Sequence, residues 1–112
     1  MLIKPTTCSI EKCIVYYLQY CRAKDQSEQT VKGKTFNLAL FERWCYLEKI
    51  DDVQSISVDV LDSYQQYLNQ YRKPQNDAPL SKGTRRNRLT AVCVFLRALF
   101  IKDLILNNHV EK

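Results

Sequence analysis

Residues 81–102 read SKGTRRNRLTAVCVFLRALFIK, and this stretch indicates the class of fold more clearly than any other in the chain. Serine is a residue type that commonly precedes the first turn of a helix, and Ser81 stands at that place. Apolar residues then recur at the spacing of one helix face, at Leu89, Val92, Phe95, Leu96 and Leu99. The stretch therefore predicts an amphipathic helix that runs from Ser81 to about Lys102 and packs these side chains into a core.

Three upstream segments show the same helical spacing. The first runs from about Ser9 to Ala23, and its apolar stripe is Ile10, Cys13, Ile14, Tyr17, Leu18 and Cys21. The second opens at a capping serine, Ser27, and runs to about Glu48, with a buried side formed by Val31, Leu38, Phe41, Trp44, Cys45 and Leu47. The third is capped by Ser57 and carries Val60, Leu61, Tyr64, Tyr67, Leu68 and Tyr71.

The segments between these helices read as connectors. An acidic stretch, Lys49 to Ser57, leads into the third helix, and a proline-bearing loop, Arg72 to Leu80, precedes the fourth. The sequence leaves open whether Asp103 to Asn108 forms a further short turn or helix. The 112 residues include only two glycines and three prolines, and no segment requires a strand. We therefore expect an all-α fold, a compact bundle of four to five helices, in a single domain over residues 1–112.

Charge is unevenly distributed along the chain. The net charge is +5. Six basic residues and no acidic one lie between Ser81 and Lys102, whereas four acidic residues and no basic one lie between Asp51 and Tyr64. A chain polarised in this way is expected to have one positive face, suited to a polyanion, and a contrasting acidic one.

Two helix starts resemble each other and supply the candidate binding residues. Ser27-Glu-Gln-Thr30 opens the second helix and Ser81-Lys-Gly-Thr84 opens the fourth. Helix N-termini present unpaired N–H groups to phosphate, and hydroxyl, lysine and arginine side chains add further donors. The neighbouring glycines would let DNA approach the backbone closely. The candidate DNA-binding residues are Ser27, Thr30, Lys32, Lys34, Ser81, Lys82, Thr84, Arg85, Arg86, Asn87 and Arg88.

The cysteines and the histidine indicate no metal site, and the sequence shows no segment that would direct the chain to a membrane. Five cysteines, Cys8, Cys13, Cys21, Cys45 and Cys93, form no CxxC pair, and His109 lies far from most of them in sequence. We interpret them as reduced thiols, partly in the core, and expect no metal and no cofactor. No apolar run approaches a membrane span, and because the first residues contain no long apolar stretch we expect no signal peptide. We therefore expect a cytoplasmic location, in a bacterium or the host of a mobile element.

Alternatives to DNA binding remain open on these residues alone. The basic run would also suit a solvated helix face, although it lacks the acidic i, i+4 partners common there. A protein-interaction module could use the acidic third helix and exposed tyrosines. A helix-turn-helix regulator would need a turn of about three or four residues before the fourth helix, in place of the proline loop. An independent enzyme lacks paired carboxylates, a nucleophile–base pair and a glycine-rich phosphate loop.

The order of these features resembles the SAM-like, core-binding N-terminal domain of the tyrosine recombinase (phage integrase) family. The matching pieces are Ser27 to Thr30 with Leu38 and Phe41, Ser57 to Val60 with Tyr64, and Ser81 to Thr84 with Arg88 to Val92 and Phe95. The resemblance covers residues 9 to about 108. Three positions depart from the family pattern, namely Lys34, Val94 and Asn108-His109.

The resemblance implies that the second and fourth helices cross double-stranded DNA with their N-terminal halves near the major groove. It also implies two protein partners, which are a catalytic domain of the same parent chain and other recombinase protomers on DNA. The catalytic Arg, Lys, His, Arg and Tyr set of the family belongs to that second domain. This chain has no H-x-x-R motif, so we expect it to bind DNA without cutting it and to contain no catalytic residue. Tyr16 and Tyr20 are candidates for contacts with a neighbouring protomer.

Overall fold

The structure, a computed structural model, describes residues 9–102 of the chain. It contains α1 (Ile10–Ala23), α2 (Glu28–Leu47), a 3-10 turn, η1 (Val53–Ser55), α3 (Val58–Gln70) and α4 (Lys82–Ile101). Within these residues the only β-type pairings are two isolated bridges, Ser9 with Asp52 and Arg72 with Pro79. The predicted all-α class is confirmed, and the helix bounds agree with the sequence to within a few residues. The turn left open at 103–108 lies outside the described residues.

A serine caps the N-terminus of each helix. The hydroxyls of Ser27 and Ser81 accept hydrogen bonds from the N–H groups of Thr30 and Thr84, each at 3.1 Å, and Ser57 accepts from Val60 at 3.3 Å. Ser9 caps α1 in the same way, by accepting from the Lys12 N–H. Because each cap satisfies one N–H that the helix leaves unpaired, each contributes about 1 kcal/mol to stability.

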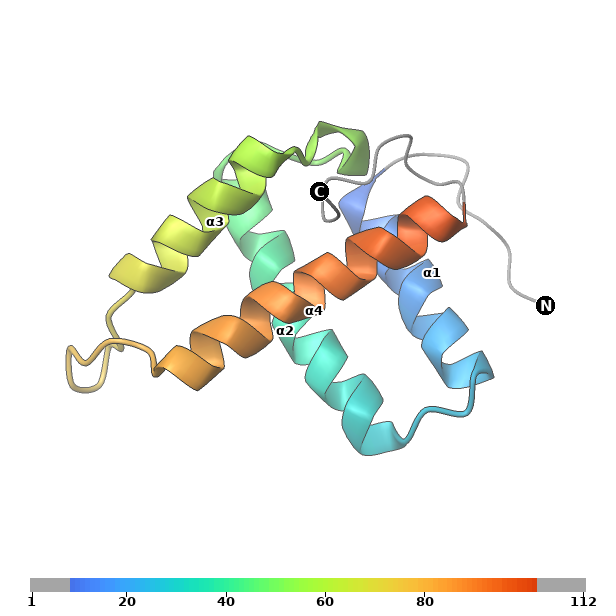
Figure 1. The fold of residues 1–112 in the computed structure, drawn as a ribbon, viewed down its shortest axis with the longest axis horizontal. Coiled ribbons are helices and arrows are strands. Elements are labelled where there is room, and N and C mark those ends of the chain that lie inside the picture. The colour runs from blue at the N-terminus through green and yellow to red at the C-terminus, as the bar shows by residue number, and fades with distance from the viewer. Residues whose placement is uncertain (1–8, 103–112) are drawn as a thin grey trace.

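The helices pack around one core in which α4 is central. α4 crosses α2 and reaches from the loop that follows α3 to α1 (Figure 1). Edge-to-face ring contacts join the helices: Tyr17 meets Phe95 at 5.4 Å between α1 and α4, and Phe41 meets Tyr64 at 4.9 Å between α2 and α3. The whole predicted stripe of α1 is buried. Each such aromatic pair adds about 1 kcal/mol beyond the area that it buries.

Two predicted core residues lie at the surface instead. Leu47 is 63% exposed and Tyr67 is 40% exposed. Leu47 follows the buried Cys45 by two residues, which turns its side chain about 200° away around the helix. Tyr67 packs its ring against those of Trp44 and Tyr64, but it lies at the open edge of the α3 stripe.

The connectors add core residues that the sequence did not assign. Val53, the first residue of the 3-10 turn, and Ile56, which follows the turn, are each 1% exposed, and Leu80 is buried just before α4. The Asp52 carboxylate accepts from the Gln54 N–H at 2.8 Å and so caps the short turn. The loop over residues 71–81 folds on itself through hydrogen bonds between Lys73 and both Asp77 and Ala78. Because this loop is long, α4 does not follow α3 across the tight turn of a helix-turn-helix.

Candidate nucleic-acid interface

The starts of α2 and α4 have the same geometry. The capping residues Ser27 and Ser81 have φ/ψ of −65°/154° and −64°/156°. In both starts the serine hydroxyl donates to the threonine Oγ1 three residues later, at 2.9 Å. Each serine is thus occupied as both acceptor and donor, whereas the hydroxyl hydrogens of Thr30 and Thr84 remain available to an external acceptor. The similarity seen in the sequence is therefore confirmed at the level of the cap.

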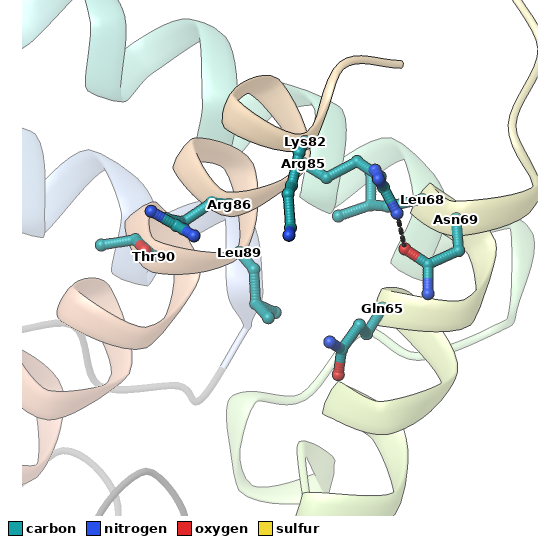
Figure 2. A pocket seen from close by; sticks show the side chains of 8 residues that line it. All are labelled: Gln65, Leu68, Asn69, Lys82, Arg85, Arg86, Leu89 and Thr90. Carbon is teal, nitrogen blue, oxygen red and sulfur yellow. Dashed lines mark hydrogen bonds between the residues drawn. The ribbon is translucent and has the colours of Figure 1, made fainter. Parts of the chain in front are cut away.

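The first turns of α4 form the basic wall of a cleft against α3. Figure 2 shows Lys82, Arg85 and Arg86 beside the polar side chains of α3 and Thr90. The Nη1 of Arg85 donates to the Asn69 Oδ1 at 2.7 Å, which fixes the guanidinium across the cleft, while the Arg85 Nε is buried without a hydrogen-bond partner. Within residues 9–102 no carboxylate pairs with these three cations. The cleft therefore carries uncompensated positive charge.

A second groove joins α2 to α4. It measures about 330 Å³ and brings together three of the candidate residues, Thr30, Lys34 and Asn87. The remaining lining is Tyr17, Gln29, Gly33, Asn37, Thr90, Ala91 and Val94. No acidic side chain lines this groove, and its hydroxyl and amide groups can each donate and accept hydrogen bonds.

The two glycines of these helix starts lie on open surface. A Cβ built at Gly33 or at Gly83 would have no heavy atom within 4 Å apart from its own residue, the two chain neighbours and the backbone of its own helix. Nothing in the described fold therefore requires glycine at either position for packing. The open space agrees with the expectation that another molecule can approach the backbone at both helix starts.

Two candidate cations are already engaged inside the molecule. The Nζ of Lys34 donates to the Gln26 Oε1 at 2.8 Å and lies 5.4 Å from the centre of the Tyr17 ring. The Arg88 guanidinium lies 5.9 Å from the centre of the Phe36 ring. Arg85 and Arg88, which are one turn apart, thus line different cavities.

The other candidate residues lie wholly or partly at the surface. Ser27, Lys32, Ser81, Lys82, Arg86 and Asn87 are exposed, whereas Thr84 and Arg85 are half-buried. Sequence reasoning missed Asn37, Asn69 and Thr90, which line the two grooves. Helical spacing offered a signal for two of them, because Asn37 follows Gly33 by four residues and Thr90 follows Asn87 by three.

Acidic groups gather around a different cavity, between the start of α1 and the end of α2. Glu11, Glu42 and Asp51 line it together with Tyr46, whose ring is 79% exposed. Burial, with a smaller contribution from Glu11, raises the pKa of the Glu42 carboxyl. Of the four acidic residues from which the sequence predicted a contrasting face, only Asp51 lines this cavity. Tyr46 is an exposed tyrosine of the kind that a protein-interaction module would use.

The tyrosines considered for contacts with a neighbouring protomer are less accessible than expected. Tyr16 is only 7% exposed, so its ring is not available at the surface. Tyr20 is half-buried, and the Nζ atoms of Lys24 and Lys102 lie 5.5 and 4.7 Å from its ring centre.

Cys13, Cys21, Cys45 and Cys93 are all reduced, the first three buried and the last half-buried. Burial raises the pKa of the Cys45 thiol to about 12, which keeps it protonated. No three His, Cys, Asp or Glu side chains of residues 9–102 are grouped as a metal site would require. Cys8 and His109 lie outside the described residues. None of the described helices is both long and apolar enough to span a bilayer.

The chain is similar to known proteins both in sequence and in structure. The chain is 32% identical over 86 residues to tyrosine recombinase XerC 2 of Ralstonia nicotianae; the match covers 77% of this chain and spans 24% of that relative's length. No family model matches. The fold is similar, with a TM-score of 0.75, to the crystal structure of the N-terminal domain of a phage integrase/site-specific recombinase from Haloarcula marismortui. That similarity covers 91% of this chain and 90% of the other at 17% sequence identity, and so concerns the fold alone.

Proposed function

We propose that this chain, whose resemblance to the N-terminal domain of the tyrosine recombinase family is confirmed in sequence and in fold, is the DNA-binding module of a site-specific recombinase or integrase. In this proposal it holds the recombination site through the N-terminal halves of α2 and α4. The observation that carries the proposal is the set of uncompensated cations at the start of α4, a helix start whose serine–threonine cap matches that of α2.

Double-stranded DNA is the polyanion that suits this surface. Lys82, Arg85 and Arg86 can bind backbone phosphates, and the exposed N-termini of two helices add N–H donors and the positive end of each helix dipole. Thr30 and Thr84 would donate their free hydroxyl hydrogens to the same phosphates.

The groove between α2 and α4 can supply contacts to bases. Asn87 can pair with the N6 and N7 atoms of adenine, and Asn37 and Thr90 offer further donors and acceptors beside it. Lys34 and Arg88 would act mainly by holding α2 in position, because their charges already contact rings of the molecule itself. Lys32 would add a contact to the backbone of the DNA, and Ser27 and Ser81 would hold the threonine hydroxyls and the helix starts in position.

The proposed parent protein would cut and rejoin DNA through a catalytic domain that is separate from this chain. The partners in that assembly would be double-stranded DNA, the catalytic domain and other recombinase protomers. In this proposal the chain contributes affinity and register to the reaction but no chemical step.

Fluorescence anisotropy with a labelled duplex of about 30 base pairs, measured over a salt series, tests this proposal. The logarithm of the affinity should fall linearly with the logarithm of salt, by about 0.9 per phosphate neutralised. Lys82→Ala/Arg86→Ala should lower this slope by about 2. The matched control is Lys12→Ala/Arg22→Ala, which removes the same charge from exposed positions of α1. Equal losses in both double variants, or affinity insensitive to salt, would overturn the proposal.

A further inference from the structure

A groove between α2 and α3 is separate from both surfaces assigned to DNA, apart from Arg88 at one end. It measures about 350 Å³ and is lined mostly by large apolar and aromatic side chains. α2 contributes Phe36, Leu40, Trp44 and Leu47, and α3 contributes the rings of three tyrosines.

The rim of this groove exposes several large apolar side chains. Phe36 is 59% exposed, Leu47 is 63% exposed and Tyr67 is 40% exposed. Single exposed apolar residues are ordinary, but several around one groove, with arginine beside them, are typical of a surface that another protein covers.

The shape of the groove suits an α-helix. Its α2 wall repeats at Phe36, Leu40, Trp44 and Leu47, a single helix face that extends over about 16 Å, or three turns. Ridges at this spacing accept the apolar stripe of a partner helix. Stacking of nucleic-acid bases is disfavoured, because the inner rings already contact one another: the ring centre of Trp44 lies 5.0 Å from that of Tyr64 and 6.3 Å from that of Tyr67.

The charge of the groove identifies the kind of helix. Arg43 and Arg88 are its only charged lining residues, and neither pairs with a carboxylate among residues 9–102. Burial raises the pKa of Tyr64 to about 12, against a smaller opposing effect of Arg88, so the phenol stays neutral and compensates neither arginine. We propose that this groove docks an amphipathic helix of a partner protein that carries leucine-like residues along one face and Asp or Glu beside them.

Two synthetic peptides test this assignment on the whole chain. Both are about 15 residues long, form helices and carry leucine at i, i+4, i+7 and i+11; one has glutamate beside the stripe, and the other has lysine at the same positions. Trp44, the only tryptophan of the chain, lines the groove, so its fluorescence reports occupancy directly. The glutamate peptide should bind at least about tenfold more tightly than the lysine peptide.

Variants at exposed positions locate the peptide. Arg43→Gln and Leu47→Asn should each weaken the glutamate peptide about tenfold. Leu47→Asn should leave the affinity for duplex DNA unchanged. The peptide-docking proposal can therefore fail while the DNA-binding proposal holds, and the reverse. Urea unfolding verifies that both variants fold.

Four results would overturn the assignment: no binding of either peptide, equal binding of both, Trp44 quenching by single-stranded oligothymidine that Leu47→Asn abolishes, or self-association in sedimentation experiments that Leu47→Asn abolishes. The last two would assign the groove to a nucleic acid or to a second copy of this chain.

Discussion

The starts of α2 and α4 share one cap geometry but differ in the charge around them. At α4, Lys82, Arg85 and Arg86 line one cleft without a carboxylate. At α2, Glu28 stands in the first turn, and of the two lysines only Lys32 is exposed while Lys34 is bound to Gln26. Identical local structure therefore does not imply equal availability to a ligand. We expect α4 to dominate affinity for DNA and α2 to contribute mainly position and shape.

Charge reversal should give the largest difference between the two helix starts in affinity for duplex DNA. Arg86→Glu places a carboxylate beside Lys82 and Arg85, so it removes one cation and also pairs with two others. We expect the affinity for duplex DNA to fall about 100-fold, because contacts that involve charged groups contribute about 1.5–3 kcal/mol each. At α2, the carboxylate introduced by Lys32→Glu would have no free cation in an equivalent cleft to neutralise. The affinity for duplex DNA should therefore fall only about tenfold.

Anisotropy at one fixed salt concentration measures both affinities, and urea unfolding serves as the control. Both residues are exposed, so the free energy of unfolding should change by no more than about 0.5 kcal/mol. Equal losses of affinity at the two positions would contradict the dominance of α4.

Removal of the caps should affect the two starts equally. Ser27→Ala and Ser81→Ala each delete a hydroxyl that accepts from a threonine N–H at 3.1 Å and donates to the threonine Oγ1 at 2.9 Å. Each should lower the free energy of unfolding by about 1 kcal/mol. Urea denaturation measures this loss, and Thr30→Ser and Thr84→Ser are suitable controls because they keep the hydroxyl pair.

Equality of the two losses is the informative outcome. A difference of about 1 kcal/mol or more would mean that the loop before α4 or the turn before α2 also depends on its cap, and that the two starts are not equivalent units.

Features of the fold that depend on neighbours in sequence were predictable. The stripes of α1 and α4 and the caps Ser27, Ser57 and Ser81 follow from the 3.6-residue period and from the preference of serine for helix starts. The basic first turns of α4 were predictable for the same reason, because all of their cations lie within seven consecutive residues.

Features that depend on residues far apart in sequence were not predictable. The contact of the Lys34 Nζ with a ring requires Tyr17 from α1, and the contact of the Arg88 guanidinium with a ring requires Phe36 from α2. The burial of Val53 and Ile56 likewise depends on where the connector crosses the core. Periodicity within one segment carries no signal for contacts of this kind, which is why Arg85 and Arg88 were expected on one surface and lie in different cavities.

Replacement of Lys34 tests whether its charge is internal or serves DNA. Lys34→Met keeps the length of the side chain and its packing on Tyr17 but removes the hydrogen bond to Gln26 and the charge over the ring. The free energy of unfolding should fall by about 1 kcal/mol or less. Affinity for duplex DNA should change by less than about threefold. Titration with DNA and urea unfolding of the same sample separate the two effects. A tenfold loss of affinity would show that the Lys34 charge serves DNA binding.

The glycines give the most direct test of close approach by DNA. Because a Cβ at Gly33 or Gly83 meets no atom within 4 Å, alanine should raise the free energy of unfolding, by up to about 1 kcal/mol within α2 and less at the first turn of α4. If DNA contacts the backbone there, the same methyl group should reduce affinity several-fold. A variant that is more stable yet binds more weakly can only have lost a contact with the ligand, since the fold itself gains. Alanine at Gly83 should show this opposition more strongly than alanine at Gly33, in keeping with the greater share of affinity assigned to α4, and unchanged affinity at both positions would place DNA farther from the helix starts.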